Sequence, residues 1–234
     1  ISGIVGMGGA SFPTHIKLNP PKKVHTLIIN IAECEPYLTG DSRLTVEKTD
    51  EIVAAIGLIG QCLPDLQTVI IAIEDNKPEA IEALRKTVKG TPYTLSVLKT
   101  QYPQGGEKQL IKKILNVEVP RAKLPFDVGV NVQNVSTVFA VYEAVYSGKP
   151  LYERVVTVTG RSLANPANLL CRIGTPLQEL IRYCGPLSAE PAKIIIGGPM
   201  MGIAQHTDLV PVIKSTTAVV LLDRKEARAL EESA

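Results

Sequence analysis

Residues 26–36, Thr-Leu-Ile-Ile-Asn-Ile-Ala-Glu-Cys-Glu-Pro, join a short apolar run to a polar loop. The run Thr26–Ile31 has the length and the β-branched composition of a buried strand. Asn30, Glu33 and Glu35 place an amide and two carboxylates where this strand ends. In an open α/β sheet, ligands bind just outside the carboxyl ends of the strands. These side chains are therefore candidates for a binding site, and the alternative is a solvated acidic loop.

The first 150 residues alternate between strand and helix patterns. Further strands are predicted at residues 68–73, 93–98 and 128–132, and helices at residues 41–62, 76–90, 105–115 and 135–148. This alternation predicts an α/β domain over residues 1–150, with a Rossmann-like, mostly parallel sheet and helices on both faces.

The pattern changes after Lys149-Pro150. Strand patterns at 154–159, 169–173 and 193–196 outnumber a single helix at 176–184, which predicts a small α+β domain over residues 151–212. We expect residues 213–234 to form a linker and the start of a helical region.

The bulk composition narrows the possible partners. A formal net charge of +2 gives no support for nucleic-acid binding, and no apolar run reaches the roughly 18 residues of a membrane span. The four cysteines and three histidines are dispersed, without the short gaps of a metal or iron–sulfur site. We therefore expect no metal in this chain, and thiols kept reduced.

Residues 6–13 read Gly-Met-Gly-Gly-Ala-Ser-Phe-Pro. Gly6, Gly8 and Gly9 permit positive φ angles and close approach of a ligand, and successive N–H groups in such a loop can converge on a phosphate. Lys17 can supply the counter-charge. The spacing differs from that of a Rossmann turn and from that of a P-loop, and a plain turn is the alternative.

Two more loops follow predicted strands. In residues 102–108, Tyr102 can stack on a ring, and the helix that opens after Gly105 presents unpaired N–H groups. Gln133-Asn134 also opens a helix, although capping alone would explain Asn134. Four such loops would meet at one edge of the sheet, as expected for a phosphorylated aromatic cofactor.

In this order, the motifs resemble the C subunit of the bacterial Rnf electron-transport complex, which is in turn similar to the flavoprotein subunit of respiratory complex I. The matching segments are residues 6–14, 32–39, 102–110, 119–125, 133–135 and 197–202.

The resemblance implies a site for FMN and NADH. The residues that would contact FMN are Gly6, Gly8, Gly9, Lys17, Asn30, Glu33, Glu35, Tyr102, Gly105, Glu107, Gln133 and Asn134. Those that would contact NADH are Phe12, Glu33, Glu35, Lys123 and Phe126. Met7 stands where complex I relatives carry Arg, Ala32 where they carry an acid, and Gly106 where they carry Glu, which predicts weaker flavin binding.

The resemblance also implies hydride transfer between NADH and FMN, followed by single-electron steps to 4Fe–4S clusters. Residues 152–212 resemble a soluble-ligand-binding β-grasp module. In the family, the cluster motifs follow the charged helix near residue 232. We therefore expect the chain to be a piece of a longer protein, trimmed at its N-terminus and lacking the iron–sulfur region.

The complete protein is expected at the cytoplasmic face of the bacterial cell membrane, held there by the other Rnf subunits. There it would couple the redox chemistry of NAD and, indirectly, ferredoxin to the pumping of sodium ions or protons. Two other functions stay open. The cobalamin reductase of propanediol-degrading microcompartments shares the flavin region, although residues 37–39 and 104–108 favour the Rnf protein. The chain could also be a non-catalytic scaffold module whose altered loops bind no flavin.

Overall fold

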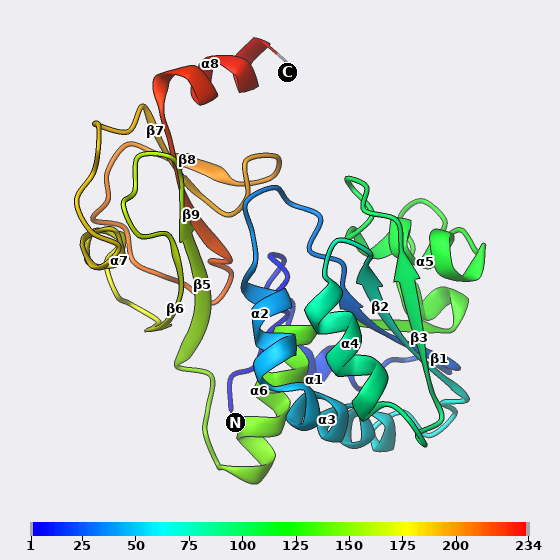
Figure 1. Ribbon diagram of the computed structural model, residues 1–234. Helices are drawn as coiled ribbons and strands as arrows, with labels where there is room; N and C mark the ends of the chain where they lie inside the picture. Colours follow the sequence, from blue (N-terminus) through cyan, green and yellow to red (C-terminus); the bar gives the residue numbers. More distant parts are fainter. Residues whose placement is uncertain (1, 233–234) are drawn as a thin grey trace. The chain divides into compact units, whose positions relative to one another are not determined.

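The computed structural model describes residues 2–232, which form two compact units (Figure 1). The first comprises the chain up to Cys34 together with Asp41–Leu151, and the second comprises Glu35–Gly40 together with the chain from Tyr152 onward. Over the described range, no helix is both long enough and apolar enough to cross a membrane.

The first unit is built on a parallel sheet with the strand order β3-β2-β1-β4. The strands are β1 (Thr26–Ile31), β2 (Thr68–Glu74), β3 (Tyr93–Leu98) and β4 (Val130–Asn134). The chain runs outward from β1 to β3 and then returns to the other side of β1. The strand order therefore reverses between β1 and β4, which is the position where open α/β sheets bind ligands.

Helices cover both faces of this sheet. They are α1 (Thr14–Lys17), α2 (Gly40–Glu47), α3 (Thr49–Gln61), α4 (Pro78–Thr87), α5 (Glu107–Leu115), the 3-10 helix η1 (Pro125–Val128) and α6 (Val135–Tyr146). Ile29 belongs to the larger core, with residues of α3, α4 and α6, whereas its neighbour Ile28 belongs to a core with Leu110 of α5. Apolar residues on both faces are typical of a buried parallel strand. The predicted α/β class is confirmed.

The segment predicted as one helix forms two helices in the structure. The apolar spacing predicts a continuous helix over residues 41–62, but α2 ends at Glu47 and α3 begins at Thr49. Lys48 between them has φ −132° and ψ 32°, which is not a helical conformation. The spacing identifies the face that packs on the sheet, but it cannot reveal a change of direction at one residue.

The second unit contains a mixed sheet with the strand order β6-β5-β9-β7-β8. Its elements are β5 (Glu153–Thr159), β6 (Ala167–Arg172), α7 (Leu177–Tyr183), β7 (Lys193–Ile196), β8 (Ile203–Gln205), β9 (Ala218–Leu222) and α8 (Arg224–Glu232). Leu177, Leu180 and Ile181 of α7 pack into the core beside Val156 and Val219. This is the small α+β fold that the sequence predicts.

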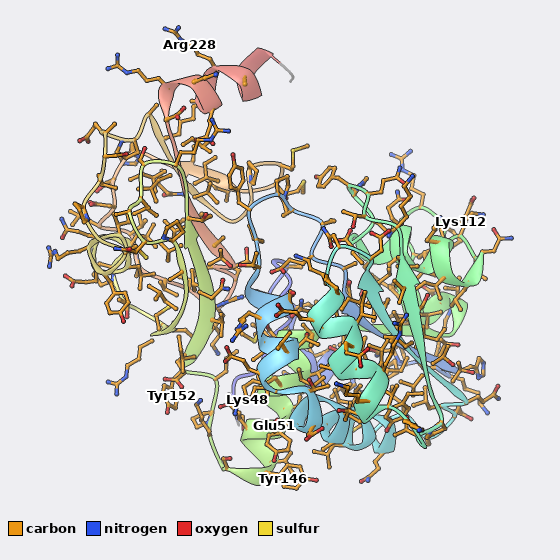
Figure 2. All side chains as sticks on the ribbon, in the orientation of Figure 1. Lys48, Glu51, Lys112, Tyr146, Tyr152 and Arg228 are labelled. Atoms are coloured by element: carbon orange, nitrogen blue, oxygen red, sulfur yellow. The ribbon has the colours of Figure 1, made fainter. Side chains whose placement is uncertain are left out.

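The sheet extends beyond the boundary expected at residue 212. Ala218–Leu222 forms its central strand, parallel to β5 and antiparallel to β7, and every residue of it is buried. A strand buried on both faces reads as a continuous apolar run without alternation. In α8, which follows, Ala227 is buried, whereas Arg228 points outward (Figure 2).

Candidate functional site

The carboxyl ends of the four parallel strands carry most of the polar residues that the sequence singles out. Asn30 near the end of β1 and Asn134 at the end of β4 are register partners in neighbouring strands. Glu33 follows β1, Lys77 follows β2 and Gly105 follows β3. Because all four strands are parallel, these ends lie along one edge of the sheet.

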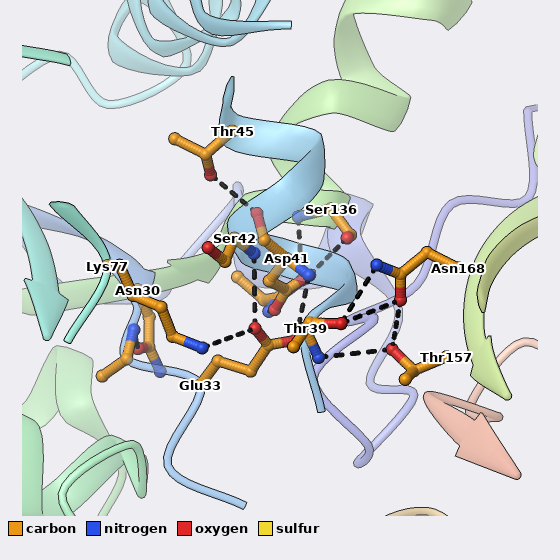
Figure 3. Close-up of polar contacts among 12 residues, drawn as sticks. Asn30, Glu33, Thr39, Asp41, Ser42, Thr45, Lys77, Ser136, Thr157 and Asn168 are labelled. Atoms are coloured by element: carbon orange, nitrogen blue, oxygen red, sulfur yellow. Dashed lines mark hydrogen bonds and ion pairs between the residues drawn. The ribbon is translucent and has the colours of Figure 1, made fainter. Parts of the chain in front are cut away.

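The Glu33 carboxylate has three partners at this edge (Figure 3). Its carboxylate accepts the N–H groups of Asp41 at 3.0 Å and Ser42 at 3.3 Å, at the start of α2. Lys77 Nζ lies 3.5 Å from Glu33 Oε2, and the Glu33 side chain is only 6% exposed. A carboxylate is favourable at a helix N-terminus, where unpaired N–H groups carry partial positive charge.

The charge of Glu33 is finely balanced. Burial raises its pKa from an ordinary value of 4.5 to about 7, and repulsion from Asp41 acts in the same direction. The Lys77 ammonium and the two backbone N–H groups act in the opposite direction. The carboxyl group therefore changes protonation near neutral pH, which is typical of residues at functional sites.

The Asp41 carboxylate extends this network to the loop after β4. Asn134 Nδ2 donates to it at 2.6 Å and Ser136 Oγ donates at 2.5 Å. The other end of the Asn134 amide accepts the N–H groups of Ser136 at 2.9 Å and Thr137 at 3.4 Å. Asn134 thus caps α6, as its sequence position predicts, and both ends of its amide are oriented.

The opening glycine-rich loop is fixed beside the same helix. Met7 N–H donates to Thr137 Oγ1 at 2.8 Å, and Gly6 N–H donates to the Phe12 carbonyl at 2.8 Å. A Cβ atom on Gly8 would lie 3.4 Å from Cβ of Asn134, whereas one on Gly9, with φ +112°, would meet nothing within 4 Å. The loop therefore presents exposed backbone next to the N-terminus of α6.

The second glycine-rich loop packs against β1. Asn30 Nδ2 donates to the Gly105 carbonyl at 2.9 Å, and Asn30 Oδ1 accepts the Ala32 N–H at 3.0 Å. A Cβ atom on Gly105 would overlap the Ala32 carbonyl oxygen. Gly105 is therefore required by this close approach, and Tyr102 lies half-buried in the same loop.

Lys17 and Glu107 form an ion pair that joins α1 to the start of α5. Gln133 acts less directly, because its Nε2 donates to Asn131 Oδ1 at 2.8 Å and Asn131 Nδ2 donates to the Lys17 carbonyl at 2.7 Å. Gln133 is buried. Its amide therefore orients the Asn131 side chain, which in turn binds the main-chain carbonyl at the end of α1.

The side chains of four predicted residues take no part in these contacts. Glu35 belongs to the second unit, where its carboxylate accepts the Met200 N–H at 3.0 Å. Phe126 packs against the larger core of the first unit, and Phe12 and Lys123 are exposed.

The sequence does not single out Asp41, Lys77, Ser136 and Thr137. Their one available signal is that each lies within three residues of the end of a strand or the start of a helix. No group of three His, Cys, Asp or Glu side chains within residues 2–232 could hold a metal ion.

A Rossmann-like sheet with two glycine-rich loops at its switch point defines a nucleotide-binding class of protein. Residues 1–143 match the family model of the Nuo51 FMN-binding domain, and residues 155–204 match that of the SLBB domain. The first match covers more than half of the chain, which therefore belongs to the Nuo51 FMN-binding domain family.

Curated relatives of this chain are named as C subunits of ion-translocating oxidoreductase complexes. The chain is 47% identical over 234 residues to the C subunit of the proton-translocating ferredoxin:NAD(+) oxidoreductase complex of Clostridium ljungdahlii, covering 99% of this chain and 51% of the relative. It is 46% identical over 231 residues to the Na(+)-translocating counterpart of Acetobacterium woodii, covering 97% and 52%. The chain spans about half the length of these relatives. The resemblance to the Rnf C subunit is confirmed.

A solved structure shares the fold. A chain of the NAD+-reducing [NiFe]-hydrogenase in the air-oxidized state superposes with a TM-score of 0.78 at 21% identity, covering 96% of this chain and 45% of that chain. At this identity the likeness shows a common fold.

Replacing Gly105 tests the close approach of the second loop to β1. We expect Gly105→Ala to lower the free energy of unfolding by about 1–3 kcal/mol, because the added methyl group overlaps the Ala32 carbonyl. Chemical denaturation measures this change. Gly57→Ala is the matched control, since its methyl group would lie 3.5 Å from Tyr93 Oη, an ordinary contact. Equal stability of the Gly105 variant and the parent would contradict this packing.

Replacing Lys77 tests the charge balance at Glu33. We expect Lys77→Met to raise the pKa of Glu33 above its value of about 7, because the ammonium group that favours the carboxylate is lost. Carbon-13 NMR titration of the Glu33 carboxyl group measures this shift. Lys86→Met, which removes an exposed lysine paired with Glu82, is the control. An unchanged or lower pKa of Glu33 in the Lys77 variant would contradict stabilisation of the Glu33 carboxylate by the Lys77 ammonium group.

Proposed function

We propose that this chain is the FMN- and NADH-binding part of an electron-transfer subunit of a membrane-associated, ion-translocating oxidoreductase. One observation carries the proposal: two glycine-rich loops and two helix N-termini converge at the switch point of a parallel sheet. Membership of the Nuo51 FMN-binding domain family and the names of the curated relatives support the same function.

The residues present fit a flavin nucleotide. Exposed backbone at Gly8 and Gly9 adjoins the N-terminus of α6, which suits a phosphate group. Lys17 supplies a cation near the start of α5. The loop that carries Tyr102 and Gly105 is held against β1 and would form the floor under the ring.

Bound FMN would supply the exchange between hydride chemistry and single-electron transfer. The protein's own task is to bind, orient and exclude water. Asn30 and Gly105 set the distance between β1 and the second loop. Glu33 and Glu107 would orient the dinucleotide, and their carboxylates would disfavour negative charge on the flavin itself. Phe12, Glu35, Gln133, Lys123 and Phe126 remain proposed contacts, and no side chain is required as a general base.

The curated relatives are about twice as long as this chain, and we propose that the whole protein has a further part of similar kind. We place its 4Fe–4S clusters in that further part. Its partners would be the other subunits of the complex, with NADH as electron donor or product and ferredoxin as an indirect partner. We further propose peripheral attachment through those subunits at the cytoplasmic face of the membrane.

Flavin titration with a phosphate-free control ligand tests the proposed site. We expect FMN, when added to the purified chain, to be retained with quenched fluorescence. Lys17→Met should weaken FMN binding by about tenfold or more, because a charged contact to phosphate is lost, and should leave the binding of riboflavin unchanged. Lys22→Met is the control, since Lys22 pairs with Asp127 near the amino end of the sheet. A parent chain that retains no flavin would refute the proposal and favour a non-catalytic scaffold module.

A second variant separates NADH from FMN. We expect Glu33→Gln to weaken NADH binding by about fivefold or more while sparing FMN, because the carboxylate is assigned to the dinucleotide. Anaerobic titration of the flavin-loaded chain, followed by flavin absorbance, measures both affinities. Glu79→Gln, at an exposed position of α4, controls for loss of a surface charge. Unchanged NADH affinity in the Glu33 variant would remove this residue from the NADH site.

A further inference from the structure

Glu74, the last residue of β2, is an ionisable side chain with no evident partner. It is 0% exposed, and neither carboxyl oxygen has a hydrogen-bond partner of standard geometry among residues 2–232, although the Gln101 N–H faces the carboxyl group and favours its charged form. Buried polar groups in folded proteins are nearly always paired, so such an exception requires an explanation. The site described above does not use Glu74.

The register of the sheet places Glu74 beside the second glycine-rich loop. Glu74 pairs with Leu98, the last residue of β3, and the loop at residues 99–106 begins directly after Leu98. Side chains alternate along a strand, so Glu74 shares the face of Ala72, which packs with Leu98 and with Leu110 of α5. Glu74 therefore lies on the face of the sheet that the loop and α5 cover.

The neighbouring residue already holds the start of this loop. Asp75 accepts the Thr100 N–H at 2.9 Å and the Thr100 hydroxyl at 2.7 Å. The far end of the loop is held by Asn30 through the Gly105 carbonyl. Between these two anchors, Glu74 is in position to act on the middle of the loop.

The surroundings of Glu74 favour its neutral form. A charged carboxylate without a hydrogen-bond partner is costly to bury, and burial is the main effect that raises the pKa of Glu74. The charge of Asp75 acts in the same direction, whereas the Gln101 N–H and the Lys77 ammonium act in the opposite direction. A neutral carboxyl group differs from a carboxylate because its O–H can donate a hydrogen bond.

We propose that Glu74 is a positioning residue, held neutral so that its O–H donates to a main-chain carbonyl of the loop at residues 99–106. In this role it sets the height of Tyr102 and Gly105 above the sheet. The consequence for flavin binding rests on the proposed function, whereas the role in the loop does not.

Two uncharged side chains of similar size separate the effect of removing the charge at residue 74 from the effect of removing its hydrogen-bond donor. Glu74→Gln keeps a neutral donor, and Glu74→Met removes it. In the unfolded chain Glu74 ionises near its ordinary value of 4.5, whereas in the folded chain its pKa is raised. The parent therefore loses stability relative to both variants as the pH rises above that value. We expect both variants to unfold at least about 2 °C above the parent at pH 8, with a smaller difference at pH 5.

Hydrogen exchange measures the stability of the loop in the absence of flavin. We expect the amides of residues 99–106 to exchange about tenfold faster in Glu74→Met than in Glu74→Gln, and FMN affinity to fall about fivefold in the Met variant only, because one hydrogen bond is lost. Asp75→Asn is the opposite control. Hydrogen bonds from Thr100 lower the pKa of Asp75. Loss of the Asp75 carboxylate should therefore destabilise the loop at pH 8.

The results for Glu74 and the results for flavin binding can be judged separately. Equal loop exchange in the Gln and Met variants would overturn the proposal, as would a Gln variant that is less stable than the parent at pH 8 or that fails to fold. Absence of FMN binding in the parent would refute the proposed function alone, because the exchange and stability results would still judge Glu74.

Discussion

The buried carboxylate of Glu33 is the contact on which the first unit's polar edge depends. It accepts two N–H groups at the start of α2 and lies 3.5 Å from the Lys77 ammonium. Asp41 then carries the network to Asn134 and Ser136 at the start of α6. Loops that follow β1, β2 and β4 are thereby joined by side chains, since the sheet's own hydrogen bonds end where the strands end.

This network explains why charged residues are tolerated at a buried edge. Two helix N-termini supply partial positive charge, and one lysine supplies a full charge, against the carboxylates of Glu33 and Asp41. The balance is incomplete, because burial still raises the pKa of Glu33 to about 7. The Glu33 carboxyl group can therefore change its charge near neutral pH while it stays buried.

Much of the fold follows from local sequence patterns. The apolar run Thr26–Ile31 predicts β1, and its alternate residues enter two different cores because helices cover both faces. Asn134 is identified as a cap from its position alone. The sequence identifies Gly105 as part of a glycine-rich turn that opens a helix, whereas its close contact with the Ala32 carbonyl is visible only in three dimensions.

The remaining features depend on register and on distant segments. Lys77 and Asp41 are ordinary charged residues in sequence, and they join the site because β2 and α2 bring them to Glu33. Glu74 lies just beyond the strand predicted at residues 68–73 and is followed by polar residues, yet it is fully buried. The run Ala218–Leu222 lacks alternation, because it is the central strand of its sheet.

FMN is proposed to bind at the switch point between β1 and β4. Amide chemical-shift mapping of the nitrogen-15-labelled chain during FMN addition tests it most directly. We expect the largest shifts at Gly8, Gly9, Gly105 and Ser136. The hollow lined by residues 19–24 and 62–65, near the amino ends of β1 and β2, should remain unaffected. Shifts confined to that hollow, or no shifts at saturating FMN, would contradict FMN binding at this switch point.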